Sequence, residues 1–212
     1  MDNDPATGGK NGAADPQALL SALVTEHFVL QSAASSTISE SGSRASIYLA
    51  ALSSGLVAIG FSSGSPDILA ALVFTVFPTV FILGTFTVVR LVDTSIASVV
   101  AQARIELIRR YYIGLDPAAA RFFPLDNSAT AGTLGVHYGA SSVLFTTASM
   151  IAVVNAVLGG AGLAVILSLS TALPIQAVVA FGAVAGLVLL ALAVAYQVRR
   201  FAPVRSAARQ TD

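Results

Sequence analysis

The residues best suited to act on an ion or a ligand form one polar face in the first hydrophobic part of the chain. Alternating steps of four and three residues select Ser32, Ser36, Ser39, Ser43, Ser46, Ala50, Ser53, Val57 and Gly60. We call this set the serine seam. Its mean spacing of about 3.5 residues is that of a seam in a left-handed supercoil. Eight of the nine residues are small. Inside a membrane, such a face indicates close contact with another helix or with water rather than with lipid.

Charged residues stand at both ends of this segment. Glu40 and Arg44 precede the hydrophobic run, and Asp67 follows it. If several copies of the helix surround an axis, Asp67 forms an outer acidic ring and Glu40 with Arg44 forms an inner mouth. The residues expected to line the path between them are Ser43, Ser46, Ser53 and Val57. The alternative is that the serine seam only packs helices together.

A second set of residues with membrane chemistry lies in the last two hydrophobic segments. Asn155 is the most polar residue of the third segment, and Gly159 and Gly162 continue its four-and-three spacing. A buried asparagine either hydrogen-bonds to a neighbouring helix or binds a substrate or ion. The fourth segment contains Gly182-x-x-x-Gly186, which is typical of two helices in close contact.

The chain lacks the residues that catalysis usually requires. It has no cysteine, and its two histidines, His27 and His137, lie in separate regions. Neither His-Glu-x-x-His nor Gly-x-Ser-x-Gly occurs. We therefore expect no catalytic site, no metal site and no cofactor. The 11 basic and 11 acidic residues cancel, so no excess of positive charge indicates a nucleic-acid partner.

Composition indicates that these residues are positioned by helices in a lipid bilayer. Of the 212 residues, 55% are hydrophobic and 10% are charged, and the mean hydropathy is +0.80. A soluble domain needs a more strongly charged surface than this. The sequence predicts an all-α integral membrane protein, a four-transmembrane-helix bundle whose first two helices extend into the cytoplasm.

Four spans are predicted, at residues 46–61, 68–89, 141–169 and 175–198. The first has 16 residues and is about 24 Å long, which is short for a hydrocarbon layer of about 30 Å. Pro78 lies inside the second span and is expected to bend it, and nearby hydroxyl groups are expected to bond to carbonyls of their own helix. These hydroxyls belong to Thr75, Thr79, Thr85 and Thr87.

The segments outside the spans have their own signals. Residues 1–14 are polar and predict a disordered tail, and residues 15–45 predict an amphipathic helix that begins at Asp15-Pro16. The second helix continues over residues 90–113 and is expected to stop at Gly114. These two extensions should pack together. A short helix is expected after Asp116-Pro117, a Gly/Thr-rich loop over residues 126–140, and a basic tail over residues 200–212.

The arginines predict the topology. With the amino terminus in the cytoplasm, all eleven basic residues fall on the cytoplasmic side, in accordance with the positive-inside rule. They are Lys10, Arg44, Arg90, Arg104, Arg109, Arg110, Arg121, Arg199, Arg200, Arg205 and Arg209. We expect a multi-pass protein of the plasma (inner) membrane with both termini in the cytoplasm.

This layout resembles the Orai-type calcium channels, which have four spans, both termini inside and a first helix that lines the pore. The acidic residue that those channels carry in the outer part of the first helix has no counterpart here. Asp67 lies just beyond the first span, so calcium selectivity is not carried over. Two functions fit the sequence. One is a homo-oligomeric cation channel lined by the first helix, and the other is a non-conducting scaffold, sensor or effector subunit that presents its cytoplasmic helices to a protein partner.

Overall fold

The computed structural model describes residues 16–123 and 147–209, and every regular element in those ranges is a helix. Its elements are α1 (Pro16–Phe61), α2 (Pro66–Leu115), the 3₁₀ helix η1 (Pro117–Arg121), α5 (Thr147–Ser170) and α6 (Ile175–Arg209). All four α-helices are long and apolar enough to cross a membrane. The predicted all-helical chain with four candidate spans is therefore confirmed. The expected tail at 1–14, the loop at 126–140 and the first residues of the third span lie outside the described residues.

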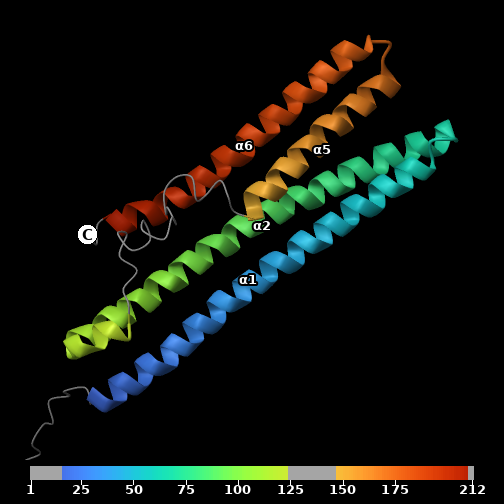
Figure 1. Ribbon diagram of the computed structural model, residues 1–212. Coiled ribbons are helices and arrows are strands. Elements are labelled where there is room, and N and C mark those ends of the chain that lie inside the picture. The colour runs from blue at the N-terminus through green and yellow to red at the C-terminus, as the bar shows by residue number, and fades with distance from the viewer. Residues whose placement is uncertain (1–15, 124–146, 210–212) are drawn as a thin grey trace, which may run out of the picture.

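The helices pack as two hairpins placed side by side. α1 packs along α2, α5 packs along α6, and α2 joins the two hairpins by packing against α5 (Figure 1). α1 and α6 therefore lie at opposite edges of the arrangement (Figure 1). Because α1 has only one extensive neighbour, most of its circumference is not covered by the described part of the chain.

Local sequence explains where these helices begin and end. Ser65 is extended and Pro66 occupies the first turn of α2, where a missing N–H costs nothing. α2 ends at Leu115, one residue after the expected stop at Gly114. The carboxylate of Asp116 then accepts a hydrogen bond from the backbone N–H of Ala118 at 2.9 Å and begins η1.

α1 and α2 are much longer than a bilayer is thick. At 1.5 Å per residue, the 46 residues of α1 and the 50 of α2 extend about 69 and 75 Å. Their extensions pack together around Leu30 of α1 and Ile105 and Ile108 of α2, as expected. α6 also continues beyond the predicted end of its span at Val198, so it includes most of the basic tail.

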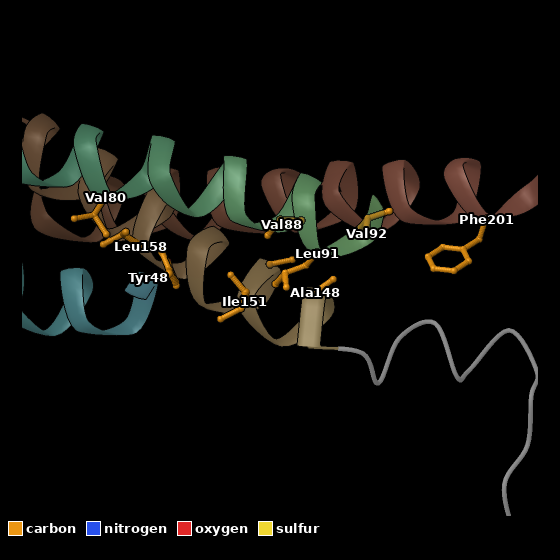
Figure 2. Packing of buried hydrophobic residues seen from close by; sticks show 10 residues of the cluster. Tyr48, Val80, Val88, Leu91, Val92, Ala148, Ile151, Leu158 and Phe201 are labelled. Carbon is orange, nitrogen blue, oxygen red and sulfur yellow. The ribbon is translucent and has the colours of Figure 1, made fainter. Parts of the chain in front are cut away.

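The main core lies where the two hairpins meet. It joins residues from all four helices (Figure 2): Tyr48, Val80, Val88, Leu91, Val92, Ala148, Ile151, Ala152, Leu158 and Phe201. Hydroxyls within the second span bond to their own helix, as expected. The Oγ1 atoms of Thr75, Thr79, Thr85 and Thr87 donate to carbonyls four residues earlier at 2.7 to 2.9 Å.

Candidate functional site

The serine seam lies on the face of α1 that points away from α2. Ala45, Tyr48 and Leu52 form the face of α1 that packs into the core. Consecutive residues are rotated by about 100° around a helix, which places Ser46 and Ala50 about 160° from Tyr48. All nine seam residues are exposed. No helix of the described chain covers the seam, so packing among the described helices does not account for it.

The hydroxyl groups on this face keep hydrogen-bonding capacity. The Oγ of Ser46 donates to the carbonyl of Gly42 at 2.9 Å. A hydroxyl oxygen has two acceptor lone pairs, which this bond leaves free. The seam can therefore accept hydrogen bonds from water or from a partner helix without losing its bonds to its own backbone.

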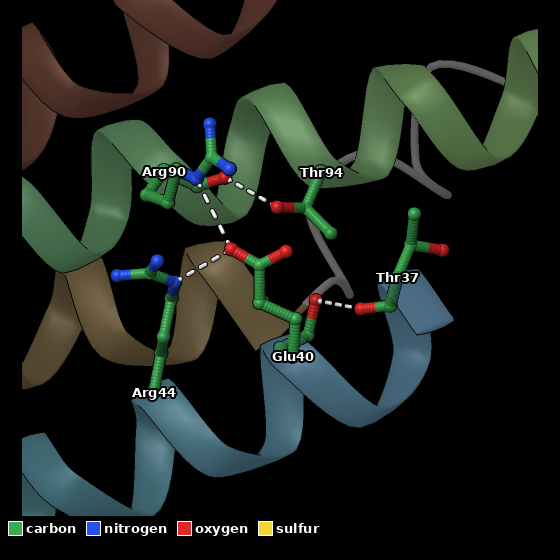
Figure 3. Close-up of polar contacts among 6 residues, drawn as sticks. Thr37, Glu40, Arg44, Arg90 and Thr94 are labelled. Carbon is green, nitrogen blue, oxygen red and sulfur yellow. Dashed lines mark hydrogen bonds and ion pairs between the residues drawn. The ribbon is translucent and has the colours of Figure 1, made fainter. Parts of the chain in front are cut away.

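Glu40 lies between two arginines (Figure 3). Its Oε1 accepts from Nε of Arg44 on the same helix at 2.8 Å and from Nε of Arg90 on α2 at 3.1 Å. These two hydrogen bonds lower the pKa of the Glu40 carboxyl below its ordinary value of 4.5. Glu40, which the sequence predicts at the inner mouth of a path, therefore points toward α2. Sequence reasoning missed Arg90 because it stands 50 positions away.

A second ion pair lies in the same region of the hairpins. Asp93 of α2 pairs with Arg200 of α6. One turn earlier on α6, the side chain of Gln197 is almost fully buried and accepts a hydrogen bond from Ser149 of α5 at 2.8 Å. Asp93 and Arg90 are three residues apart on α2, so both ion pairs lie at one level of the molecule. We call Glu40, Arg44, Arg90, Asp93 and Arg200 the charged layer.

Asn155 connects three helices inside the core. Its Oδ1 accepts from the hydroxyl of Tyr48 on α1 at 3.3 Å, and its Nδ2 donates to Oγ1 of Thr85 on α2 at 3.1 Å. Asn155 is 6% exposed and Tyr48 is fully buried. Gly84 leaves room for both side chains: a Cβ there would lie 2.1 Å from Oδ1 of Asn155. Hydrogen bonding to a neighbouring helix is one of the two roles that the sequence allows for Asn155. That its neighbours are Tyr48 and Gly84 could not be predicted from the sequence.

The glycines allow α5 and α6 to approach closely. A Cβ on Gly160 would lie 2.5 Å from the carbonyl oxygen of Gly182 and 3.1 Å from Cα of Gly186. The two predicted glycines of α6 therefore face Gly160, which the four-and-three pattern did not select. Gly159 instead faces Phe81 and Leu189, and Gly162 faces Phe77.

Asp67 lies exposed in the first turn of α2. A carboxylate there is stabilised by the positive end of the helix dipole. Across residues 16–123 and 147–209, no group of three or more histidine, aspartate or glutamate side chains is arranged to hold a metal ion.

The chain matches no protein-family model, no curated protein and no solved structure. Three features of the described residues therefore bear on function: the exposed serine seam, the charged layer and the contacts of Asn155.

Proposed function

We propose that this protein assembles from several copies through α1 and conducts cations along a path lined by the serine seam. The observation that carries this proposal is the exposure of all nine seam residues on the face of α1 opposite α2. A small, hydroxyl-rich helix face in a membrane gains little from lipid and more from a second helix or water. Closed rings of identical subunits bring the same face of each copy to one axis.

The charges support a path that selects cations at its outer end. Asp67 is exposed at the end of the α1–α2 hairpin that lies away from the arginines, so a ring of these carboxylates would concentrate cations there. At the other end, Glu40 is flanked by Arg44 and Arg90, which leaves a net positive charge. We therefore assign cation attraction to Asp67 and not to Glu40.

The topology we propose has both termini in the cytoplasm of a cell bounded by a plasma (inner) membrane. Ion pairs bring Arg44, Arg90 and Arg200, from three helices, to one level of the molecule. Arginines gathered at one level suit the cytoplasmic surface of a membrane. This arrangement supports the orientation inferred from the eleven basic residues.

Conductance of purified protein in planar bilayers tests the proposal. Ser53→Leu places a large apolar group on the seam and should remove most of the current, because a narrowed apolar path loses its water. Ser54→Leu adds the same group about 100° around the helix and should have a smaller effect. Asp67→Asn should lower the current most at low ionic strength, where screening is weak. Equal effects at Ser53 and Ser54, or no current from a correctly assembled oligomer, would contradict conduction through the seam.

Assembly can be tested separately from conduction. The chain has no cysteine, so Ser53→Cys introduces a single thiol on the seam. Oxidation in the membrane should give covalent dimers, because a seam at an oligomer axis brings the same residue of neighbouring copies together. The matched control is Ser54→Cys, which is also exposed but lies off the seam. Equal crosslinking of the two variants would argue against association through this face.

A second function, a non-conducting scaffold, is favoured by an apolar surface outside the predicted spans. In the extension of α1, Val24, Phe28 and Val29 are exposed, whereas Leu30 on another face packs against α2. Exposed apolar residues beyond the membrane are typical of a surface that binds a protein. As a scaffold, the protein would use the seam only to associate, and a correctly assembled oligomer would carry no current.

A further inference from the structure

A groove runs between α2 and α6, with α5 as its floor. It consists of two adjoining cavities of about 470 and 420 Å³ that share Phe81 of α2 and Leu189 of α6. The floor extends from Ala152 to Ile166 of α5, a rise of about 21 Å at 1.5 Å per residue. Gly159 and Gly162 lie along this floor, and the side chains of Phe81, Leu189 and Phe77 from the two walls lie over them.

We propose that this groove binds an acyl chain of an anionic phospholipid, with the phosphate at the end that carries Arg199 and Arg200. The proposal is independent of whether the protein conducts ions. It rests on three properties of the groove, which are its volume, the chemistry of its walls and the charge at one end.

The volume and length of the groove suit a hydrocarbon chain. The groove is long and is divided into two cavities of about 470 and 420 Å³. The side-chain ends of Phe81 and Leu189 both lie over Gly159, where the two cavities meet. An acyl chain is flexible enough to bend over these two side chains.

The walls present hydrocarbon rather than free polar groups. Thr85, Asn155 and Tyr196 are the polar residues of the groove, and Tyr196 stands at the end next to Arg200. The hydroxyl of Thr85 donates to the carbonyl of Phe81 and accepts from Asn155, whose own oxygen accepts from Tyr48. Because these atoms already have partners, this part of the groove favours an acyl chain over a polar headgroup.

The ion pair of Asp93 and Arg200 stands at one end of the groove. Asp93 lies one turn beyond Val89 on the α2 wall, and Arg200 lies one turn beyond Tyr196 on the α6 wall. Arg199 is the preceding residue of α6 and is exposed, so this end of the groove has a second arginine in addition to the Asp93–Arg200 pair. Basic groups between helices at a membrane surface bind anionic lipid headgroups. Phosphate would compete with Asp93 for the guanidinium of Arg200.

Native mass spectrometry of the full-length protein in detergent tests the proposal, with phosphatidylglycerol and phosphatidylcholine of identical acyl chains as probes. Phosphatidylglycerol should be retained more strongly. Arg199→Gln should lower its retention about fivefold, the effect of one arginine near an anionic surface, and leave phosphatidylcholine unchanged. Asp93→Asn should raise retention of phosphatidylglycerol, because Arg200 loses its competing carboxylate. If the Asp93–Arg200 ion pair only stabilised the fold, Asp93→Asn would not raise the retention of phosphatidylglycerol.

A matched pair of substitutions tests where the acyl chain lies. Ala193→Phe fills the groove and should lower the retention of both lipids strongly. If this variant does not fold, the smaller Ala193→Leu takes its place and should also lower the retention of both lipids. Ala195→Phe, on an exposed part of α6 outside both cavities, should leave retention unchanged. Equal retention of both lipids by the wild type, or equal effects at Ala193 and Ala195, would overturn the proposal. Loss of the oligomer with Ala193→Phe but not Ala195→Phe would assign the groove to a second copy instead.

Discussion

Tyr48 of α1 donates a hydrogen bond to Asn155 of α5 over 3.3 Å, although 107 positions separate the two residues. α1 and α5 make few other contacts, so this bond directly ties the first helix to the second hairpin. Both side chains are buried, and Asn155 also bonds to Thr85 of α2. Interhelical hydrogen bonds of this kind stabilise membrane proteins by about 0.6 kcal/mol on average. The close fit around them is therefore as important as the bonds themselves.

The first prediction tests that fit at Gly84. Gly84→Ala would place a Cβ 2.1 Å from Oδ1 of Asn155 and 2.6 Å from Cε2 of Tyr48. Relieving this overlap should cost about 1–3 kcal/mol, the usual range for overpacking a core. The measurement is the free energy of unfolding in detergent. Gly42→Ala, where no atom lies within 4 Å of the new Cβ, is the control and should not destabilise the protein. Similar destabilisation of both variants would count against the Tyr48–Asn155 contact.

The second prediction compares two adjacent glycines of α5. Gly160→Ala directs its Cβ at the backbone oxygen of Gly182, 2.5 Å away, so α5 and α6 must separate. Gly159→Ala meets the side-chain ends of Leu189 and Phe81 at 2.6 and 2.7 Å, and these can move. Thermal unfolding in detergent should show a larger loss for Gly160→Ala. A larger loss for Gly159→Ala would contradict the close backbone contact.

The third prediction concerns the helix packing assigned to Gly182 and Gly186. A Cβ on Gly186 would lie 3.2 Å from the carbonyl oxygen of Ala156, so Gly186→Leu should separate α5 from α6 and weaken the folded protein. Size-exclusion chromatography and thermal unfolding measure the effect. Leu187→Ala, on an exposed apolar position of the same helix, serves as a control. An unchanged melting temperature for Gly186→Leu would show that this contact contributes nothing.

The fourth prediction is a pH dependence that arises from Glu40. Its pKa in the folded protein lies below 4.5, because Arg44 and Arg90 stabilise the carboxylate. The ionised form therefore contributes stability above pH 4.5, and this contribution is lost as the pH falls through the lowered pKa. Melting temperature measured from pH 7 to 3 should fall less steeply for Glu40→Gln than for the wild type. If the melting temperatures of Glu40→Gln and the wild type fell equally with pH, Glu40 would not contribute to the loss of stability in acid.

The fifth prediction tests the topology. Single cysteines at Ser63, Thr171 and Ala207 enter a chain that has none of its own. Ser63 and Thr171 are exposed at the turns of the two hairpins, so a membrane-impermeant thiol reagent outside intact cells should label both. Ala207→Cys should react only after the cells are permeabilised. Labelling of Ala207→Cys from outside would reverse the orientation.

Local interactions were predictable from the sequence because helix geometry determines them. Four apolar stretches of sufficient length predict four candidate spans. The ion pair of Glu106 and Arg110 is also predictable, because residues four apart are neighbours on a helix. Nε of Arg110 lies 3.3 Å from Oε1 of Glu106. Threonine hydroxyls can donate a hydrogen bond to a carbonyl one turn earlier in any helix, whatever surrounds that helix.

Contacts between helices were decided by tertiary structure alone. Two stripes with about the same spacing run along α1, the serine seam and the face with Ala45, Tyr48 and Leu52. Hydropathy does not distinguish them, since small and apolar residues suit lipid, a neighbouring helix or a second copy. Only the packing order α1–α2–α5–α6 determines that Tyr48 turns inward to Asn155 while Ser46 and Ser53 face outward. Helix packing joins residues that are distant in sequence, and periodicity within one helix carries no information about its neighbour.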